Sequence, residues 1–257
     1  MKVCLGNKLE AARTVTCLPL KYDWMSYTSQ EKGLILGASK IYFPTIHYAS
    51  VFSSLGKATF PSWASYQLLG DKVRQSLAFE AAGIPVPKTR LFTGRHRAQR
   101  IEELFSYPFV AKVPVGSSRG QGVFLIKARQ DLDAYLEQVS VAYIQEYIEL
   151  ERDIRVVVLG QEAVLSYWKI ASPGELATNV ARGGIIDFDD VPQEAMELAL
   201  EAAKRCSIDH AGFDICIGPG RGPLVLEANI HFGREGFEKA GLSYKAILSK
   251  MADSGRI

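Results

Sequence analysis

Short apolar segments that end at glycine or proline alternate along this chain with segments of helical periodicity. In the first 65 residues the apolar segments are brief and are separated by Ser, Tyr and Phe. Residues 33–37 and 40–44 are predicted to be strands of a small α/β lobe. The pattern becomes regular from residue 71 onward.

The first clear helix signal has markers at both of its ends. Asp71 is a suitable N-cap, and Val73, Leu77 and Ala81 are predicted to share one apolar face. Gly83 is predicted to end the helix, because the proline-rich segment that follows must be extended.

The remaining elements mix helices and strands in the manner of α+β or α/β proteins. Helices are predicted over residues 98–105, 132–139 and 192–205, and strands over residues 109–113, 123–126 and 143–148. Two β-hairpins are predicted, 154–159 with 163–168 and 213–217 with 224–228. The last helix begins where Asp190 and Gln193 resemble a capping box.

Composition and charge are those of an ordinary globular protein. Apolar residues make up 47% of the chain, charged residues make up 23%, and the net charge is +2. This balance, without a run of Lys and Arg, predicts no binding to nucleic acid or to a membrane surface. The four cysteines form no C-x-x-C pair, and no apolar stretch is long enough for a transmembrane helix. We therefore expect a cytoplasmic protein, and the sequence is compatible with a homo-oligomer.

The second hairpin carries the strongest chemical signal. Asp214 lies four residues before its turn and Glu227 four residues after it, so antiparallel pairing places the two carboxylates opposite each other. Asn229 shares the face of Glu227 because side chains alternate along a strand. Two carboxylates about 5 Å apart repel, so a cation is expected between them, and an oxygen-only set suits magnesium or manganese. A solvated hairpin face, or an ion pair with Arg or Lys, explains the same spacing.

A lysine and a glycine-rich turn form the second signal. Lys112 lies in an apolar strand that leads directly into residues 116–122, which include Ser117, Gly120 and Gly122. Backbone N–H groups of such a turn approach phosphate oxygens, and a nearby ammonium supplies the opposite charge. A plain hairpin turn with a solvated lysine is the alternative interpretation.

Two further groups of polar residues suit a nucleotide. The extended stretch Gln145, Glu146, Tyr147 and Ile148 offers backbone donors and acceptors to an adenine edge, and Asp153 is a carboxylate for ribose hydroxyls. Lys169, and Asn179 with Arg182 before a glycine pair, suit a transferring phosphoryl group or a developing oxyanion. Taken singly, an exposed acid and a surface loop with a solvated arginine explain these groups as well.

The order of the motifs is more specific than any one of them. They are D-K with A-G-I-P-V-P, then F-V-A-K, Q-E-Y-I, D-I-R-V-V-V-L-G, N-V-A-R-G-G, A-G-F-D, G-P-L-V-L-E-A-N and G-R-E-G-F-E-K. In this succession the chain resembles RimK-like ATP-grasp ligases, the type that adds glutamate to a ribosomal-protein terminus, over about residues 61–250. Beyond the metal residues, His231-Phe232 stands where the family usually has Ser-Pro.

The resemblance implies an α+β ATP-grasp fold, in which two α+β lobes clasp ATP and a small N-terminal α/β lobe precedes them. The lobes would span residues 1–65, 66–140 and 141–257. Lys72 and Lys112 would contact the phosphates, Glu146 and Tyr147 the adenine, and Asp153 the ribose, with Thr178 and Asn179 near the nucleotide. Asp214, Glu227 and Asn229 would hold Mg²⁺ or Mn²⁺, and Lys169 and Arg182 would be catalytic.

The implied reaction moves the γ-phosphoryl of ATP onto a carboxylate. An amine, from an amino acid, a peptide or a protein terminus, then attacks the acylphosphate and gives an amide, ADP and phosphate. Two alternatives remain at this point. One is a ligase that makes a small dipeptide-type product from a free amino acid, and the other is a nucleotide-binding regulatory protein without turnover.

Overall fold

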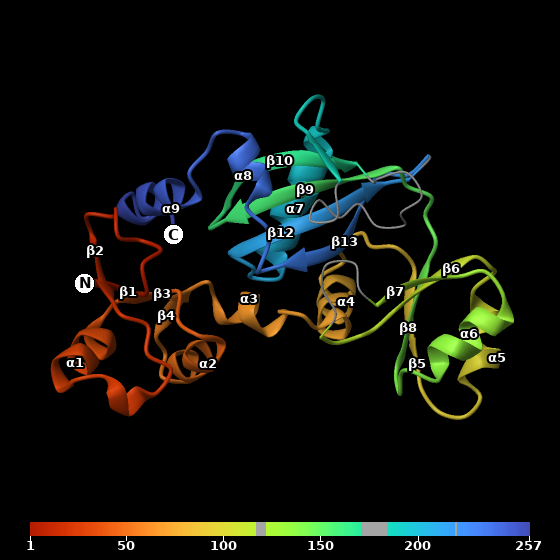
Figure 1. Cartoon of the computed structure of the whole chain (residues 1–257), viewed down its shortest axis with the longest axis horizontal. Coiled ribbons are helices and arrows are strands. Elements are labelled where there is room, and N and C mark those ends of the chain that lie inside the picture. Colours follow the sequence, from red (N-terminus) through yellow and green to blue (C-terminus); the bar gives the residue numbers. More distant parts are fainter. Residues whose placement is uncertain (117–121, 171–183, 219) are drawn as a thin grey trace.

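The computed structural model describes residues 1–116, 122–170, 184–218 and 220–257, and its strands form three sheets (Figure 1). The N-terminal sheet is parallel, with the order β2-β1-β3-β4. Its elements are β1 (Lys2–Leu5), β2 (Val15–Leu18), η1 (Trp24–Ser26), α1 (Ser29–Gly37), β3 (Lys40–Tyr42), α2 (Ile46–Ser54) and β4 (Ala58–Phe60). The short α3 (Trp63–Gln67) leads out of this lobe toward the rest of the chain.

One of the two strands predicted in the N-terminal lobe is confirmed and the other is wrong. The prediction at residues 40–44 corresponds to β3, but residues 33–37 belong to α1. Thr28 and Glu31 form a capping box, in which Thr28 Oγ1 accepts from Glu31 N at 3.2 Å and Glu31 Oε2 accepts from Thr28 N at 2.7 Å. This cap starts a helix upstream of the apolar residues, so they lie within it.

The second sheet, called the β5–β8 sheet, is antiparallel and has the order β5-β8-β6-β7. Its elements are α4 (Lys72–Ala81), β5 (Thr89–Phe92), α5 (Arg97–Leu104), β6 (Phe109–Lys112), β7 (Val123–Ile126), α6 (Arg129–Leu136) and β8 (Ala142–Glu146). Ile101 of α5 and Leu132 of α6 pack against Phe109, Ala111 and Ile144 on one face. The other face is left for Lys112, Tyr143 and Gln145, because side chains alternate along β6 and β8.

The third sheet, called the β9–β13 sheet, is antiparallel and has the order β11-β10-β9-β12-β13. Its elements are β9 (Arg152–Leu159), β10 (Glu162–Ile170), β11 (Ile185–Asp187), α7 (Gln193–Arg205), β12 (His210–Ile217) and β13 (Pro223–Asn229). Both predicted hairpins are therefore confirmed. Helix α7 covers one face, where Ala199 and Ala202 pack on Ile154, Val156 and Phe213.

The start of α7 differs from the prediction although the helix itself is confirmed. Pro192 is the N-cap and makes no side-chain cap hydrogen bond. Asp190 has a φ of +49° instead of a capping geometry, and the Gln193 amide donates to Glu197 Oε1 at 2.7 Å. The proposed capping box is therefore wrong, and the conformation of the preceding turn is the reason.

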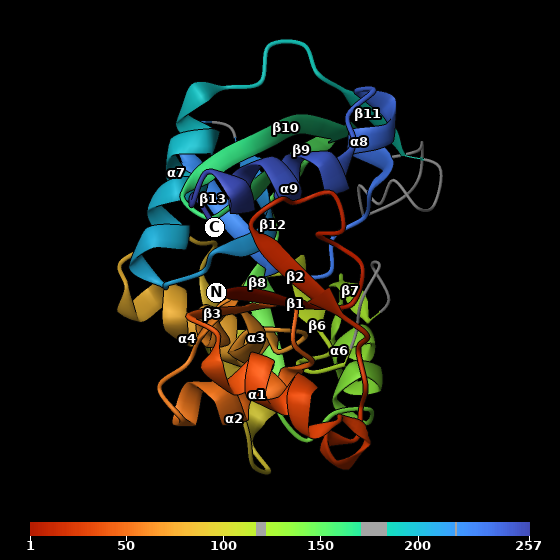
Figure 2. The ribbon, with the colours of Figure 1, turned by 90° about the vertical axis from the view of Figure 1, so that its left-hand side faces the viewer.

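The C-terminal helices α8 (Glu235–Lys239) and α9 (Tyr244–Asp253) join the β9–β13 sheet to the N-terminal lobe. The Tyr42 hydroxyl donates to the Ile257 carbonyl at 2.8 Å. The Asp253 carboxylate accepts from the backbone N–H groups of Arg13 and Thr14, each at 2.8 Å. Both ends of the chain consequently lie on the same side of the molecule (Figure 2). Among the described residues, no helix has both the length and the apolar character that a bilayer span requires.

Helix α4 connects the two antiparallel sheets through a polar side chain. The predicted N-cap is confirmed, because Asp71 Oδ1 accepts from Arg74 N at 3.0 Å. The predicted apolar face is wrong: Leu77 is 57% exposed, whereas Lys72, Gln75 and Phe79 are buried. Gln75 donates to the Ala228 carbonyl at 2.8 Å and accepts from the Ala228 N–H at 2.9 Å. It thus occupies the open edge of β13, which would otherwise expose unpaired backbone groups.

Replacing Gln75 by Leu should destabilise the protein while leaving its helices intact. Two backbone groups of Ala228 lose their side-chain partner, and buried unsatisfied groups cost about 1–3 kcal/mol each. The free energy of unfolding in urea should fall by about 2–4 kcal/mol. Leu77→Gln, on the exposed side of the same helix, is the matched control and should change it by less than about 0.5 kcal/mol. Equal effects of the two substitutions would contradict this account.

A neutral histidine is enclosed where the N-terminal lobe meets β12. His210 is 3% exposed, and its Nε2 lies 2.5 Å from the Tyr244 hydroxyl. The rings around it, here called the aromatic cluster together with His210, are Phe43, Phe60, Phe232 and Tyr244. Burial lowers the pKa of His210 well below its ordinary value of 6.5, and the charges of Lys8 and Arg234 lower it further.

Acid should therefore destabilise the fold through His210. The folded state keeps this ring neutral, whereas the unfolded chain binds a proton below pH 6.5, so stability is present above that pH and falls below it. One proton corresponds to a slope of about 1.4 kcal/mol per pH unit. Urea unfolding from about pH 7 to about pH 5 measures this slope. In His210→Gln, which keeps a partner for Tyr244 but has no titrating ring, the slope should be smaller, and an unchanged slope would contradict the assignment.

Candidate active site

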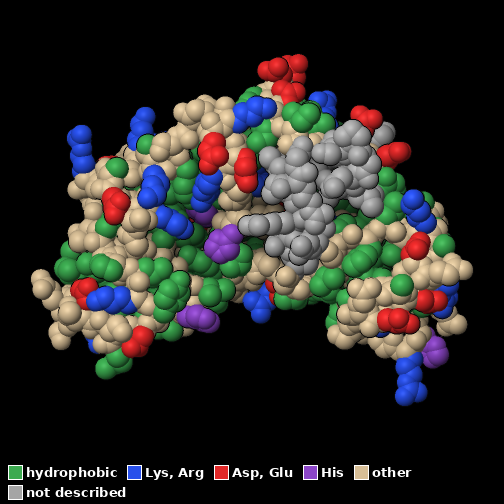
Figure 3. All heavy atoms as spheres, viewed as in Figure 1, with side chains coloured by type: hydrophobic (Ala, Val, Ile, Leu, Met, Phe, Trp, Pro, Cys, Tyr) green, Lys and Arg blue, Asp and Glu red, His purple; other side chains and the backbone are tan. Residues whose placement is uncertain are grey.

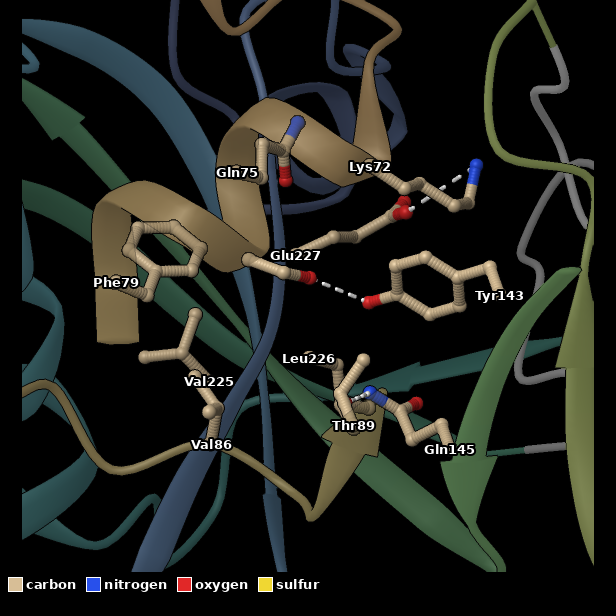
Figure 4. A pocket seen from close by; sticks show the side chains of 11 residues that line it. Lys72, Gln75, Phe79, Val86, Thr89, Tyr143, Gln145, Val225, Leu226 and Glu227 are labelled. Carbon is tan, nitrogen blue, oxygen red and sulfur yellow. Dashed lines mark hydrogen bonds and ion pairs between the residues drawn. The ribbon is translucent and has the colours of Figure 1, made fainter. Parts of the chain in front are cut away.

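A pocket lies between the free face of the β5–β8 sheet, helix α4 and strand β13. Lys72 and Gln75 of α4, Tyr143 and Gln145 of β8, and Glu227 of β13 are among its lining residues (Figure 4). The Tyr143 and Ser76 hydroxyls are 2.7 Å apart, and Gln145 Nε2 donates to Thr89 Oγ1 at 2.9 Å. These hydrogen bonds hold the Tyr143 and Gln145 side chains in place within the pocket.

Lys72 lines this pocket, and a second lysine, Lys112, lies beside Tyr143 of its lining. Lys72 is the first residue of α4, and its Nζ lies 4.0 Å from Glu227 Oε2. Lys112 is the last residue of β6 and its Nζ lies 5.9 Å from the centre of the Tyr143 ring. Burial lowers the pKa of Lys112, and the charge of Lys72 lowers it too, while Glu227 acts in the opposite direction. Two ammonium groups are thus held close together in a site of low exposure.

The carboxylate pair predicted from the second hairpin is brought together. Asp214 is the cross-strand partner of Glu227, which confirms the predicted register at this position. The register shifts by one residue directly beyond it, where Ile215 pairs with Val225. Asn229 Nδ2 donates to Glu227 Oε1 at 2.6 Å and to Asp214 Oδ2 at 3.3 Å. All three side chains therefore reach a common point.

Two cationic side chains already neutralise Asp214. Arg155 donates to both of its carboxylate oxygens, at 2.7 and 3.1 Å, and Lys169 Nζ lies 2.8 Å from Oδ1. Lys169 also lies 3.1 Å from Asp153 Oδ1. Burial raises the pKa of Asp214, but Arg155 and Lys169 outweigh it and bring the pKa from 3.8 to about 2. The alternative of an ion pair with Arg or Lys is thus confirmed at Asp214. The expectation of two bare carboxylates that repel each other is wrong, because Asp214 is already neutralised.

Arg155 is the residue of this network that the sequence reasoning missed. It pairs with Asp214 across β9 and β12, and it follows Asp153 by two residues on the same face of β9. Gly212 provides the space for it, because a Cβ there would lie 2.9 Å from Arg155 Cδ. The sequence signal was the spacing of Asp153 and Arg155, which places both side chains on one face of a strand. To predict that Arg155 meets Asp214, one must also know that β9 pairs with β12.

The residues predicted for the base lie at the end of β8, and Asp153, predicted for the sugar, lies near the start of β9. Strand β8 ends at Glu146, two residues earlier than predicted, so Tyr147 and Ile148 follow it. Glu146 Oε1 accepts from Lys88 N and from Arg221, both at 2.8 Å. Burial raises the pKa of Glu146, and the hydrogen bond from Arg221 and that from Lys88 lower it by more. Asp153 is 6% exposed beside Lys169, so its contact with a ribose stays a prediction.

Several predicted residues lie outside the described part of the chain. They are Ser117, Gly120, Thr178, Asn179 and Arg182. Gly122 is described: it has a φ of +74°, and its carbonyl accepts from Val113 N at 2.7 Å. The phosphate loop and the catalytic role of Arg182 remain predictions.

Comparison with known proteins agrees with the arrangement of the sheets. Residues 63–251 match the RimK-like ATP-grasp domain. A probable α-L-glutamate ligase of Enterobacter sp. (strain 638) is 33% identical over 198 residues, which cover 73% of this chain and 64% of that protein. A ribosomal protein bS6–L-glutamate ligase of Escherichia fergusonii is 32% identical over 218 residues, covering 75% of this chain and 72% of that protein.

A solved structure extends the agreement to the whole fold. The ATP-grasp ligase PsnB, complexed with minimal precursor, Mg and ADP, has a TM-score of 0.72 at 16% identity, over 99% of this chain and 97% of that one. The predicted ATP-grasp fold and the predicted resemblance are confirmed. The chain spans less than two thirds of the Enterobacter relative, namely 64% of its length.

The ion network predicts that two substitutions at the carboxylate pair change the free energy of unfolding by very different amounts. Asp214→Asn leaves Arg155 and Lys169, whose side chains are 12% and 9% exposed, with too little negative charge. Without added nucleotide or metal, this variant should lose about 3–5 kcal/mol of unfolding free energy. Glu227→Gln is the matched control: its side chain is 30% exposed and it keeps an acceptor for Asn229, so the change should stay below about 1 kcal/mol. Urea unfolding of both variants measures the difference, and equal stability would remove Asp214 from the centre of the network.

Proposed function

Because this chain belongs to the RimK-like ATP-grasp family, we propose that it is an ATP-dependent ligase that joins a carboxylate to an amine. One observation carries the proposal. Lys72 and Glu227 line one pocket 4.0 Å apart, Glu227 is the cross-strand partner of Asp214, and the charge of Lys112 interacts with those of Lys72 and Glu227, so candidate phosphate-binding cations lie beside candidate metal-binding oxygens.

The lysines suit the phosphates of ATP. A phosphate chain in a site of low exposure requires fixed positive charge, and two buried lysines supply it, Lys72 at the start of α4 and Lys112 at the end of β6 beside the Tyr143 ring. Burial of Lys112 lowers its pKa in the present state, and bound phosphates would favour its charged form. Glu146 and Tyr147 at the end of β8 are assigned to the base, and both side chains are only half-buried there.

The three oxygen-bearing side chains fit magnesium. Asn229 lies within hydrogen-bond distance of both Asp214 and Glu227, and the three side chains offer the hard oxygen donors that magnesium or manganese prefers. Among the described residues, no group of three His, Cys, Asp or Glu side chains offers a competing metal site. When bound, magnesium neutralises the charge of the phosphates during transfer.

Lys169 and Arg155 hold Asp214 in position and supply positive charge beside it. In the proposed reaction a substrate carboxylate oxygen attacks the γ-phosphorus, and the bond from that phosphorus to the β,γ-bridging oxygen breaks, so ADP leaves. The amine nitrogen then attacks the carbonyl carbon of the acylphosphate, phosphate leaves with the bonding electrons, and the amine loses a proton to give the amide. Fixed cations near the transferring group stabilise the charge that develops on it.

The names of the relatives narrow the choice of amine substrate. Both are glutamate ligases by name, and this supports an amino acid as the amine substrate of this chain. The amines of a free amino acid, of a peptide and of a protein terminus are the three classes of amine substrate to be compared. The test is acceptor-dependent release of ADP from ATP and magnesium, with the joined product identified by mass spectrometry. ATP binding without release of ADP in the presence of any carboxylate and amine pair would support a nucleotide-binding regulatory protein without turnover instead.

Nucleotide binding should depend on Lys112. Replacing it by Met keeps most of its volume and removes a charge-assisted contact worth about 1.5–3 kcal/mol, so affinity for ADP with magnesium should fall about tenfold or more. Calorimetry measures the affinity of the parent and the variant. Lys127→Met, at an exposed position directly after β7, is the control and should bind as the parent does. Unchanged affinity in Lys112→Met, with the fold intact, would refute the assignment.

A further inference from the structure

Two basic side chains that belong neither to the pocket nor to the ion network described above lie on the aromatic cluster. Lys8 Nζ is 4.3 Å from the centre of the Phe43 ring. The Arg234 guanidinium carbon is 3.4 Å from the centre of the Tyr244 ring and 4.6 Å from that of Phe232. Phe43 and Phe232 both contact His210, at ring distances of 5.8 and 5.2 Å. One continuous aromatic surface therefore holds both cations in place.

These cations have no acidic partner in the described residues. Within residues 1–116, 122–170, 184–218 and 220–257, no carboxylate oxygen lies within 4.0 Å of Lys8 Nζ or of the Arg234 guanidinium. Arg234 Nη1 is buried and lacks a hydrogen-bond partner there. Burial lowers the pKa of Lys8, and the positive charge of Arg234 lowers it further. Two like charges held together without a counter-charge destabilise the protein unless something anionic binds them.

The position of this pair connects it to the proposed reaction. Strand β13 carries Glu227 and Asn229, and the chain continues directly through His231 and Phe232 to Arg234. Side chains of Lys, Arg and His gather on the surface between helices α8 and α9 and the N-terminal lobe (Figure 3). His231-Phe232 replaces the Ser-Pro that the family usually has, and Phe232 supplies a ring on which Arg234 lies. The departure in sequence thus helps to build the cationic surface.

We propose that Lys8 and Arg234 form an anion subsite that binds a carboxylate or phosphate group of the substrate, separate from the group that reacts. The inference rests on the proposed function only in assigning the anion to a substrate. A planar guanidinium and an ammonium provide charge-assisted hydrogen bonds of the kind that select carboxylates and phosphates. The substrate class is then a molecule with one reacting group near Asp214, Glu227 and Asn229 and a second, anionic group beyond Asn229.

Anion binding can be measured without turnover. The full chain is titrated at low ionic strength with glutarate, with its neutral diamide glutaramide, and with inorganic phosphate, and backbone amide signals of residues 231–235 are followed by NMR. Glutarate, phosphate or both should shift these signals, and glutaramide should not. The anion that binds more tightly identifies the group on the substrate as carboxylate or phosphate.

Variants assign the binding to the two cations. Lys8→Met and Arg234→Met should each weaken anion binding about tenfold or more, and Arg234→Lys should retain part of it. Lys204→Met and Arg95→Met, at exposed positions elsewhere, are matched controls and should bind as the parent does. Failure of every anion to shift these signals, an equal shift by glutaramide, or an equal loss in the controls would overturn the proposal. Arg234→Lys keeps the charge of Arg234, so its partial loss of anion binding still tests the proposal if Arg234→Met does not fold.

A nucleotide titration separates this proposal from the proposed function. All subsite variants should bind ADP with magnesium as the parent does, because none of them alters the lysines or carboxylates of the pocket. If the parent binds glutarate but not ADP, the ligase proposal fails and the anion subsite stands. If ADP binds but no anion does, the opposite holds.

Discussion

The pairing of β12 with β9 on one side and β13 on the other decides the chemistry of this protein. It places Asp214 between Arg155 and Glu227, so one carboxylate belongs both to a buried ion network and to the candidate metal site. A shift of one residue in either pairing would turn these side chains to the apolar face that α7 covers. The register is secured because Ile154, Val156 and Phe213 of that apolar face are fully buried.

A second constraint is the contact between α4 and the edge of β13. Gln75 binds both backbone groups of Ala228, and this contact sets Lys72, three residues earlier in the chain, near Glu227. The same contact therefore covers an exposed sheet edge and positions Lys72, the lysine proposed to bind phosphate, near a carboxylate. A helix with an apolar stripe at this place could pack there, but it would leave the edge of β13 unpaired.

The sequence was sufficient for features that depend on local periodicity. Both hairpins, helix α7 and the opposition of Asp214 and Glu227 follow from strand alternation and turn residues near them in the chain. The apolar face of α4 was wrong because Gln75 is buried by a residue more than a hundred positions away. The strand expected at residues 33–37 was wrong because the capping box of Thr28 and Glu31 begins a helix before the apolar run. The role of Arg155 depended on the pairing of β9 with β12, which no local pattern reveals. Motif order, in contrast, identified the family, since it does not require any of these contacts.

The two groups of cations differ in how their charge is balanced, and this difference separates their roles. Arg155 and Lys169 are buried beside Asp214 and Asp153, so their charge is largely compensated within the fold and they serve to position a carboxylate. Lys8 and Arg234 lie on aromatic rings, which stabilise a cation without neutralising it. Gly212 stands between the two groups, since a Cβ there would lie 2.9 Å from both Arg155 and Phe232. A compensated ion network and a pair of cations without an acidic partner among the described residues thus lie on either side of Gly212, the first beside the proposed metal site and the second at the proposed anion subsite.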